Sequence, residues 1–316
     1  MLFKYKSWLL PFLLFNGIII SNQAFVMGRS FQSDSAVLIS HEGLQHGSDT
    51  DSSNQQNTHQ KGLHFSHPLF TESPSPDKKI RMDYFFKNLT REEGDQHTPR
   101  LEAEYAFFRN LSVEVDVPYT FQKRFVEPSG RSTVDRLDNV EIGLKYANFM
   151  FEDAGLLLGG GLELGLPTGN DKKGIGSNNE LEIEPFLDFG YKPHPDWEIV
   201  GFVSLGFPTN ENITSPAGEY EAEENEAGED EADQELGWNL SILYHLSPRI
   251  ETLLEFHGES VFGGEEDGFS SVRVGPGIKV QLTNNPNLQI GVGTSFPLAD
   301  DRESDFESIF SLFYHF

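Results

Sequence analysis

The sequence contains no cysteine, which excludes a disulfide framework, a thiolate metal site and a lipidated N-terminal cysteine. Basic residues are also scarce: 23 Lys and Arg stand against 50 Asp and Glu, so the formal charge is −27. Because the phosphates of nucleic acids would be repelled, we expect no nucleic acid among the partners. After residue 30 the chain also lacks any run of about 18 apolar residues, so no transmembrane helix is predicted.

The first residues have the layout of a secretory signal peptide. Lys4 and Lys6 precede an apolar run over 8–20, and the small residue Ala24 follows a short polar stretch. An uncleaved membrane anchor is the weaker alternative, because the apolar run is short for a span. We therefore expect export, with a signal peptide over residues 1–24.

The next segment, residues 25–78, is rich in Ser, Gln, Asp, Asn and His and shows no apolar period. This composition predicts a disordered or loosely attached periplasmic segment. Imidazoles clustered on such a segment are able to chelate a transition metal, but their spacing matches no closed metal site. We interpret them as polar linker residues and expect neither a bound metal nor a cofactor. The histidines concerned are His41, His46, His59, His64 and His67.

From residue 79 to 316 apolar and polar residues alternate. Ile80, Met82 and Tyr84, for example, alternate with Arg81 and Asp83. A strict period of two predicts a strand with one face in an apolar medium and the other in a polar one. Segments of this kind span 80–87, 100–107, 111–121, 140–146, 156–164, 181–189, 197–207, 236–244, 250–256, 272–282, 288–296 and 306–316.

The last of these segments indicates how the strands are arranged. Phe306, Phe310, Leu312, Tyr314 and Phe316 share one face. A terminal strand leaves an unpaired edge unless it pairs with the first strand and closes a barrel, and an aromatic outer face fits lipid. The sequence therefore predicts an all-β fold: a transmembrane antiparallel up-and-down β-barrel of about 12 strands. We expect it in the outer membrane of a Gram-negative bacterium, with outer-membrane lipid and the outer-membrane assembly machinery as partners.

The connections between these segments alternate in length. Short turns alternate with longer loops near 122–138, 167–178, 208–234, 262–269 and 298–304, an asymmetry typical of outer-membrane barrels. The stretch 219–235 contains acidic residues and no basic residue, and predicts a solvated loop.

The inward face of the predicted barrel is rich in carboxylates. A ring of carboxylates in a narrow pore favours cations over anions, whereas charges that pair with one another fill the interior. A barrel of about 12 strands lies between filled and open sizes, so both alternatives stay open. The candidate lumen-lining residues are Glu102, Glu104, Glu114, Asp116, Glu141, Lys145, Glu182, Glu184, Asp188, Glu255, His257 and Arg273, and Glu163 has the same parity.

These patterns favour a channel that passes small solutes through an acidic lumen. One alternative is a closed structural or surface-interaction barrel without transport. A second is an outer-membrane hydrolase, which needs a serine and a histidine within reach on the lipid side. Because His245 and His257 both have inward parity, we expect no enzymatic activity.

Several stretches resemble the outer-membrane transporters grouped with the MetA pathway of phenol degradation. The resemblance covers about residues 66–316 and is carried by Ser66–Asp77, Arg81–Tyr84, Glu102–Ala106, Glu114–Tyr119, Asn139–Tyr146 and Gly159–Gly169. It implies an outer-membrane channel for small aromatic or other organic solutes, and it supplies no binding residues.

Overall fold

The computed structural model describes residues 63–90, 94–126, 130–170, 174–209, 234–263, 267–282, 285, 287–299, 302 and 304–316, all within one compact unit. The predicted signal peptide, residues 25–62 of the predicted loose segment and residues 210–233, which hold most of the acidic loop, lie outside the described residues. Within the described part of the chain, no helix is long and apolar enough to cross a membrane.

The described residues form strands joined by turns, with one short 3-10 helix, η1 (Glu152–Ala154). The strands are β1 (Lys78–Leu89), β2 (Gly94–Phe108), β3 (Leu111–Val126), β4 (Gly130–Leu137), β5 (Val140–Phe151), β6 (Leu156–Leu166), β7 (Leu181–His194), β8 (Trp197–Thr209), β9 (Gln234–Ser247), β10 (Ile250–Phe262), β11 (Ser270–Gln281), β12 (Leu288–Pro297) and β13 (Ser304–His315).

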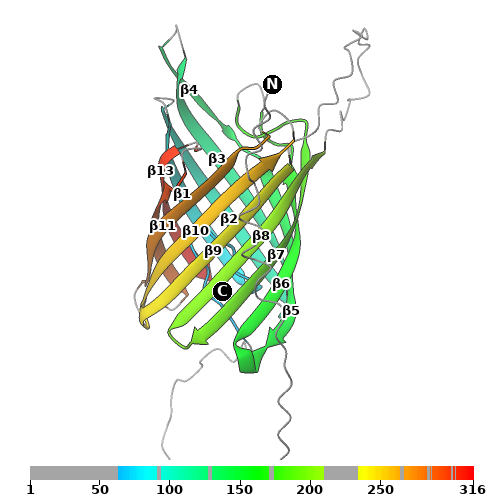
Figure 1. The fold of residues 1–316 in the computed structure, drawn as a ribbon, viewed down its shortest axis with the longest axis vertical. Coiled ribbons are helices and arrows are strands. Elements are labelled where there is room, and N and C mark those ends of the chain that lie inside the picture. The colour runs from blue at the N-terminus through cyan, green and yellow to red at the C-terminus, as the bar shows by residue number, and fades with distance from the viewer. Residues whose placement is uncertain are drawn as a thin grey trace, which may run out of the picture. The chain divides into compact units, whose positions relative to one another are not determined.

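The strands close into an antiparallel barrel (Figure 1). Apart from β4, each strand pairs with the strands that precede and follow it, and β3 pairs directly with β5. The barrel closes where β1 pairs with β13, in a register that places Lys79 opposite His315 and Tyr84 opposite Phe310. Thirteen strands form the sheet, and β4 pairs only with β3, so twelve strands make the closed wall. The prediction of a closed barrel of about 12 strands is confirmed.

β4 was not predicted. The sequence predicts a loop over 122–138, but β3 continues to Val126 and pairs with β4 as a hairpin that extends beyond the barrel wall (Figure 1). The hydroxyl of Tyr119 on β3 donates to Asp135 on β4 at 2.9 Å. That loop prediction was wrong because the apolar alternation that marks a lipid-facing strand breaks off at Lys123, and β4 contains only two apolar residues, Val134 and Leu137.

The side chains divide between the two faces as the alternation predicts. On the outer face Met82 is 56% exposed and Phe310 48% exposed, whereas the neighbouring Arg81 and Ser311 are buried on the inner face. A soluble protein has a polar surface and an apolar core. A barrel in lipid has an apolar outer face and a polar interior, as this one does. The fold is therefore a transmembrane barrel.

One end of the barrel carries short turns and the other carries longer connections. Only 109–110, 195–196 and 248–249 separate β2 from β3, β7 from β8 and β9 from β10. The opposite end has the β3–β4 hairpin and the longer connections 167–180 and 210–233. We call these the short-turn end and the long-loop end.

Candidate functional site

The lumen near the short-turn end holds a network of buried ion pairs. Lys79 on β1 places its ammonium 2.7 Å from Glu102, 2.9 Å from Glu104 and 3.4 Å from Glu114. The side chains of Lys79, Glu102 and Glu104 are fully buried. Buried charges of this kind persist only when they are paired, so the network holds β1, β2 and β3 together from the inside.

Three further cations extend this network. Arg81 and Arg100 contact Asp83 at 2.8 and 2.6 Å, and Arg100 lies 4.0 Å from Asp116. Lys145 on β5 lies 3.8 Å from both Glu104 and Glu114. Of the predicted lumen residues, Glu102, Glu104, Glu114, Asp116 and Lys145 are thus brought together, and their charges are largely compensated.

The next stretch of the wall carries carboxylates that form no ion pair with a cation of the described residues. Glu163 on β6 lies directly opposite Glu184 on β7, and Glu141 on β5 is separated from Glu182 on β7 only by Gly165. Among the described residues, none of these four carboxylates has a cation within ion-pair distance. Like charges placed opposite each other destabilise a sheet, so this acidic wall, Glu141, Glu163, Glu182 and Glu184, is retained at a cost in stability.

Asp188 continues the acidic face of β7 toward the short-turn end. Its side chain is 4% exposed, and neither carboxylate oxygen has a hydrogen-bond partner among the described residues. Gly159 lies opposite it on β6, and a Cβ added there would be 2.2 Å from Asp188 Oδ1, so the glycine provides the space for this carboxylate.

Residues 63–77 lie inside the barrel, and we call them the lumen segment. Glu255 on β10 accepts hydrogen bonds from the backbone amides of Leu69 and Phe70 at 3.2 and 3.0 Å. Glu198 on β8 accepts from the amide of Ser66 at 2.8 Å. Carboxylates of the barrel wall therefore accept the hydrogen bonds of these backbone amides, as the carbonyl groups of a neighbouring strand would do.

Basic side chains of the wall bind the carbonyl groups of the same segment. Lys279 donates to the carbonyl oxygen of His67 at 2.7 Å, and Arg81 donates to that of Leu69. The lumen segment is thus bound to the barrel wall, whereas the sequence predicts that it is disordered or loosely attached. The reason is that charged groups of distant strands, which sequence alone does not bring together, supply its hydrogen bonds.

Apolar side chains anchor the lumen segment as well. Phe65 and Leu69 are at most 1% exposed and join a buried cluster with Ile309 and Phe313 of β13. A Cβ added to Gly291 on β12 would crowd the Cδ2 methyl group of Leu69, so the glycine leaves room for that side chain as it is placed. The inward face of the wall is thus shaped to receive this segment.

The lumen segment ends in a group of histidines around Asp77. Burial and the charge of Lys79 lower the pKa of His67 to about 3. Burial raises the pKa of Asp77, but hydrogen bonds from His315, His64 and His67 outweigh it and hold that pKa well below its usual range. At neutral pH His67 is uncharged and Asp77 is a carboxylate.

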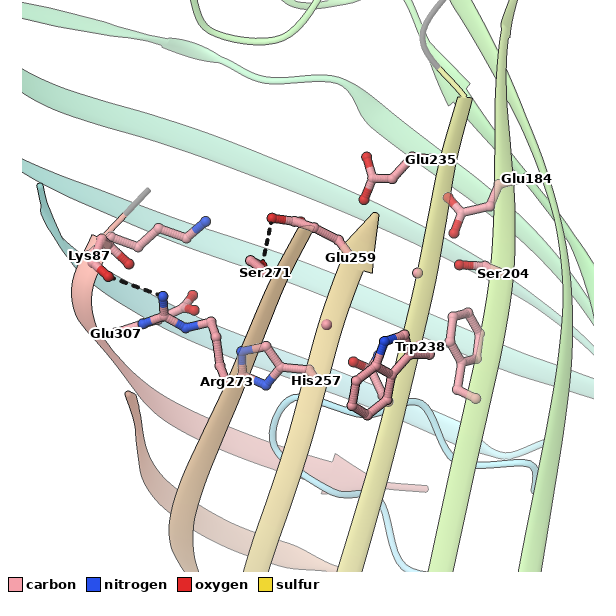
Figure 2. Close-up of a pocket in the computed structure, with 15 residues that line it drawn as sticks. Lys87, Glu184, Ser204, Glu235, Trp238, His257, Glu259, Ser271, Arg273 and Glu307 are labelled. Atoms are coloured by element: carbon pink, nitrogen blue, oxygen red, sulfur yellow. Dashed lines mark hydrogen bonds between the residues drawn. The ribbon is translucent and has the colours of Figure 1, made fainter. Parts of the chain in front are cut away.

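A cavity of about 260 Å³ lies in the lumen on the long-loop side of the segment (Figure 2). Glu184, His257 and Arg273 point toward it from β7, β10 and β11. The ring of Phe70, in the lumen segment, lies 5.1 Å from that of His257, centroid to centroid, so the segment borders the cavity. Arg273 is held in place by the hydroxyl of Ser295 and the carbonyl oxygen of Ser304, both at 3.2 Å.

The predicted lumen residues therefore fall into four places. One group joins the ion-pair network, a second forms the acidic wall with Asp188 beside it, Glu255 binds the lumen segment, and His257 and Arg273 line the cavity. The sequence reasoning missed Lys79 and the lumen segment. Lys79 has the same parity as Arg81, so extending the alternation by two residues would have found it, whereas the segment itself carries no periodic signal.

Comparison with known proteins gives one family and a set of similar folds. The family described as "Putative MetA-pathway of phenol degradation" matches residues 103–307. An outer membrane channel from Pseudomonas putida has a TM-score of 0.56 at 13% identity, over 76% of this chain and 96% of that chain. The NanC porin has a TM-score of 0.48 at 9% identity, over 74% of this chain and 98% of that chain. At these identities the likeness concerns the fold alone, and no curated protein matches the sequence.

Proposed function

Because this chain belongs to the family described as "Putative MetA-pathway of phenol degradation", we propose that it is an outer-membrane channel that passes small solutes through an acidic lumen. In the conformation described here the lumen segment occupies the pore. The fold shared with the Pseudomonas putida outer membrane channel supports this proposal.

The observation that carries the proposal is the acidic wall. Glu163 and Glu184 face each other, and neither has a cation within ion-pair distance among the described residues, although the network beside them pairs its charges closely. A barrel that needed only stability would not keep opposed carboxylates, because they repel. Carboxylates that line a pore attract cations and repel anions, which gives this arrangement a use in selectivity.

The solutes that fit are small cations and neutral organic compounds rather than anions. Phe202, His257 and Glu184 all line the cavity, so aromatic rings and a carboxylate border the same space. Ring faces attract cations and apolar rings alike. This chemistry suits small aromatic or other organic solutes, in line with the family description.

A closed structural barrel is the second candidate, and the lumen segment favours it. Phe65 and Leu69 are buried as deeply as core residues, and Glu255 binds the backbone of the segment. On this alternative the segment never leaves the lumen, and the long-loop end carries out the function. The two candidates differ in one measurable property, conduction.

Catalysis is not part of the proposal. A hydrolase needs a serine hydroxyl bound to a histidine, and among the described residues no serine hydroxyl hydrogen-bonds to a histidine ring. His245 instead contacts Glu198 at 3.0 Å and Glu251 at 3.5 Å, and His257 packs against Phe70.

The test is ion selectivity of the refolded full chain in a planar bilayer under a salt gradient. We expect a reversal potential that indicates cation preference, and we expect Glu163→Gln combined with Glu184→Gln to reduce it. Glu152→Gln combined with Asp153→Asn, at two exposed positions in η1, removes the same number of charges outside the lumen and is the matched control. Selectivity that is unchanged in the double variant, or reduced equally by the control, would exclude the acidic wall as its source.

A further inference from the structure

Three imidazole rings converge on a single carboxylate oxygen at the short-turn end of the lumen. Asp77 Oδ2 accepts from His64 Nε2 at 3.3 Å, from His67 Nε2 at 3.2 Å and from His315 Nδ1 at 2.9 Å. The rings of His67 and His315 lie 5.6 Å apart, centroid to centroid. One oxygen atom therefore gathers three nitrogen atoms that are each able to bind a metal ion.

These residues come from opposite ends of the described chain. His64, His67 and Asp77 belong to the lumen segment, whereas His315 is the last residue of β13. The pairing of β1 with β13 places Lys79, two residues after Asp77, opposite His315. Closure of the barrel thus creates the cluster, which links the lumen segment to the strand that completes the wall.

Around Asp77 Oδ2, the spacing of these atoms approaches that of a tetrahedral metal site. Zinc binds imidazole nitrogen and carboxylate oxygen at about 2.0–2.2 Å, so neighbouring ligand atoms of a tetrahedron lie about 3.3–3.5 Å apart. The three separations from Asp77 Oδ2 are 2.9, 3.2 and 3.3 Å, close to these edges. Ligand atoms of His64, His67 and Asp77 all lie within 4.8 Å of one another.

We propose that this cluster is a binding site for a divalent transition metal of the zinc class, with His64, His67, Asp77 and His315 as its ligands. Imidazole with one carboxylate is a donor set that zinc, nickel and copper accept, whereas calcium and magnesium prefer oxygen. The site is open to solvent, because the side chains of His64 and His315 are 37% and 21% exposed. The ion fastens the lumen segment to β13.

Binding requires two local rearrangements. The ring of His315, which lies outside the set of ligand atoms within 4.8 Å of one another, must move toward the other nitrogen atoms, and His67 must change its tautomer. Lys79 lies 3.2 Å from His67 Nδ1, so His67 now accepts there and donates from Nε2. When Nε2 binds a metal ion, the proton moves to Nδ1 and the contact with Lys79 is lost. Glu102 and Glu104, at 2.7 and 2.9 Å, then keep the ammonium in place.

The first experiment titrates Co²⁺ into the refolded full chain, prepared without a histidine tag. We expect one Co²⁺ per chain with the intense visible bands of four-coordinate cobalt, and displacement by Zn²⁺. His67→Gln and His315→Gln should each weaken binding by more than the about 10- to 100-fold that loss of an outer-shell partner costs. A control replaces His41, His46 and His59 together by glutamine and should keep the bands. Circular dichroism verifies that each variant keeps its strands.

Two results of this titration would overturn the site: no four-coordinate bands in the wild-type chain, or bands that the three-histidine control loses and His315→Gln keeps. The second experiment follows amide hydrogen exchange of residues 63–77. Zn²⁺ should slow this exchange in the wild-type chain and leave it unchanged in His315→Gln. Exchange that Zn²⁺ does not slow, in a chain that binds Co²⁺, would refute the fastening of the lumen segment. Neither experiment depends on conduction, so the channel proposal can fail independently.

Discussion

Truncation of Leu69 to alanine is expected to loosen the lumen segment. Leu69 is 1% exposed and sits in the space that Gly291 leaves open, beside Ile309 and Phe313. Leu→Ala at a buried site costs about 2–5 kcal/mol. Because Leu69 makes these contacts only while the segment is inserted, the loss acts on the equilibrium between the inserted and withdrawn segment. A loss of about 3 kcal/mol raises the withdrawn population about a hundredfold.

The assay is solute influx into liposomes that contain the refolded Leu69→Ala chain. We expect faster influx than in the wild-type chain at equal protein content. Leu246→Ala is the matched control, because Leu246 is 60% exposed on the outer surface of β9 and the same truncation there leaves the lumen unchanged. Influx that stays at the wild-type level, in Leu69→Ala protein shown to be folded, would refute the idea that this packing holds the pore closed.

Two further predictions concern the wall itself. Lys79→Met leaves Glu102 and Glu104 buried without their common cation and should lower the free energy of unfolding by about 3–5 kcal/mol in denaturant titrations. The control is Lys123→Met, at an ion pair whose lysine is 54% exposed, and it should change the free energy of unfolding by less than about 1 kcal/mol. Equal effects of the two variants would contradict the role of the network. Phe310→Lys places a charge on the outer face in the middle of β13 and should cost about 2–4 kcal/mol in a bilayer, and no loss there would contradict a lipid-facing position.

The wall of the barrel was predictable from the sequence because its signal is local. Met82 and Phe310 are outward and Arg81 and Ser311 inward, as period-two alternation requires of strands with lipid on one side. Closure through β13 followed from its apolar face and from the hazard of an open edge. The candidate lumen residues rest on the same signal, because parity alone assigns a side chain to a face, and their role in lining a pore stays a prediction.

The contents of the lumen were not predictable in this way. Residues 63–77 show no periodicity, and their partners, such as Glu255 and Lys279, lie far along the chain. Parity also cannot tell a paired carboxylate from an unpaired one: Glu102 meets Lys79, whereas Glu163 meets Glu184. The histidine cluster was missed because His315 joins the other ligands only after the barrel closes.

The most direct test of the channel proposal is single-channel recording of the refolded full chain in a planar bilayer with a potassium chloride gradient. We predict discrete conductance steps, with a reversal potential on the cation-selective side and more frequent openings for Leu69→Ala. Silence from both folded proteins would contradict a channel and favour the closed barrel. Anion-selective steps would contradict the acidic lumen as the basis of selectivity.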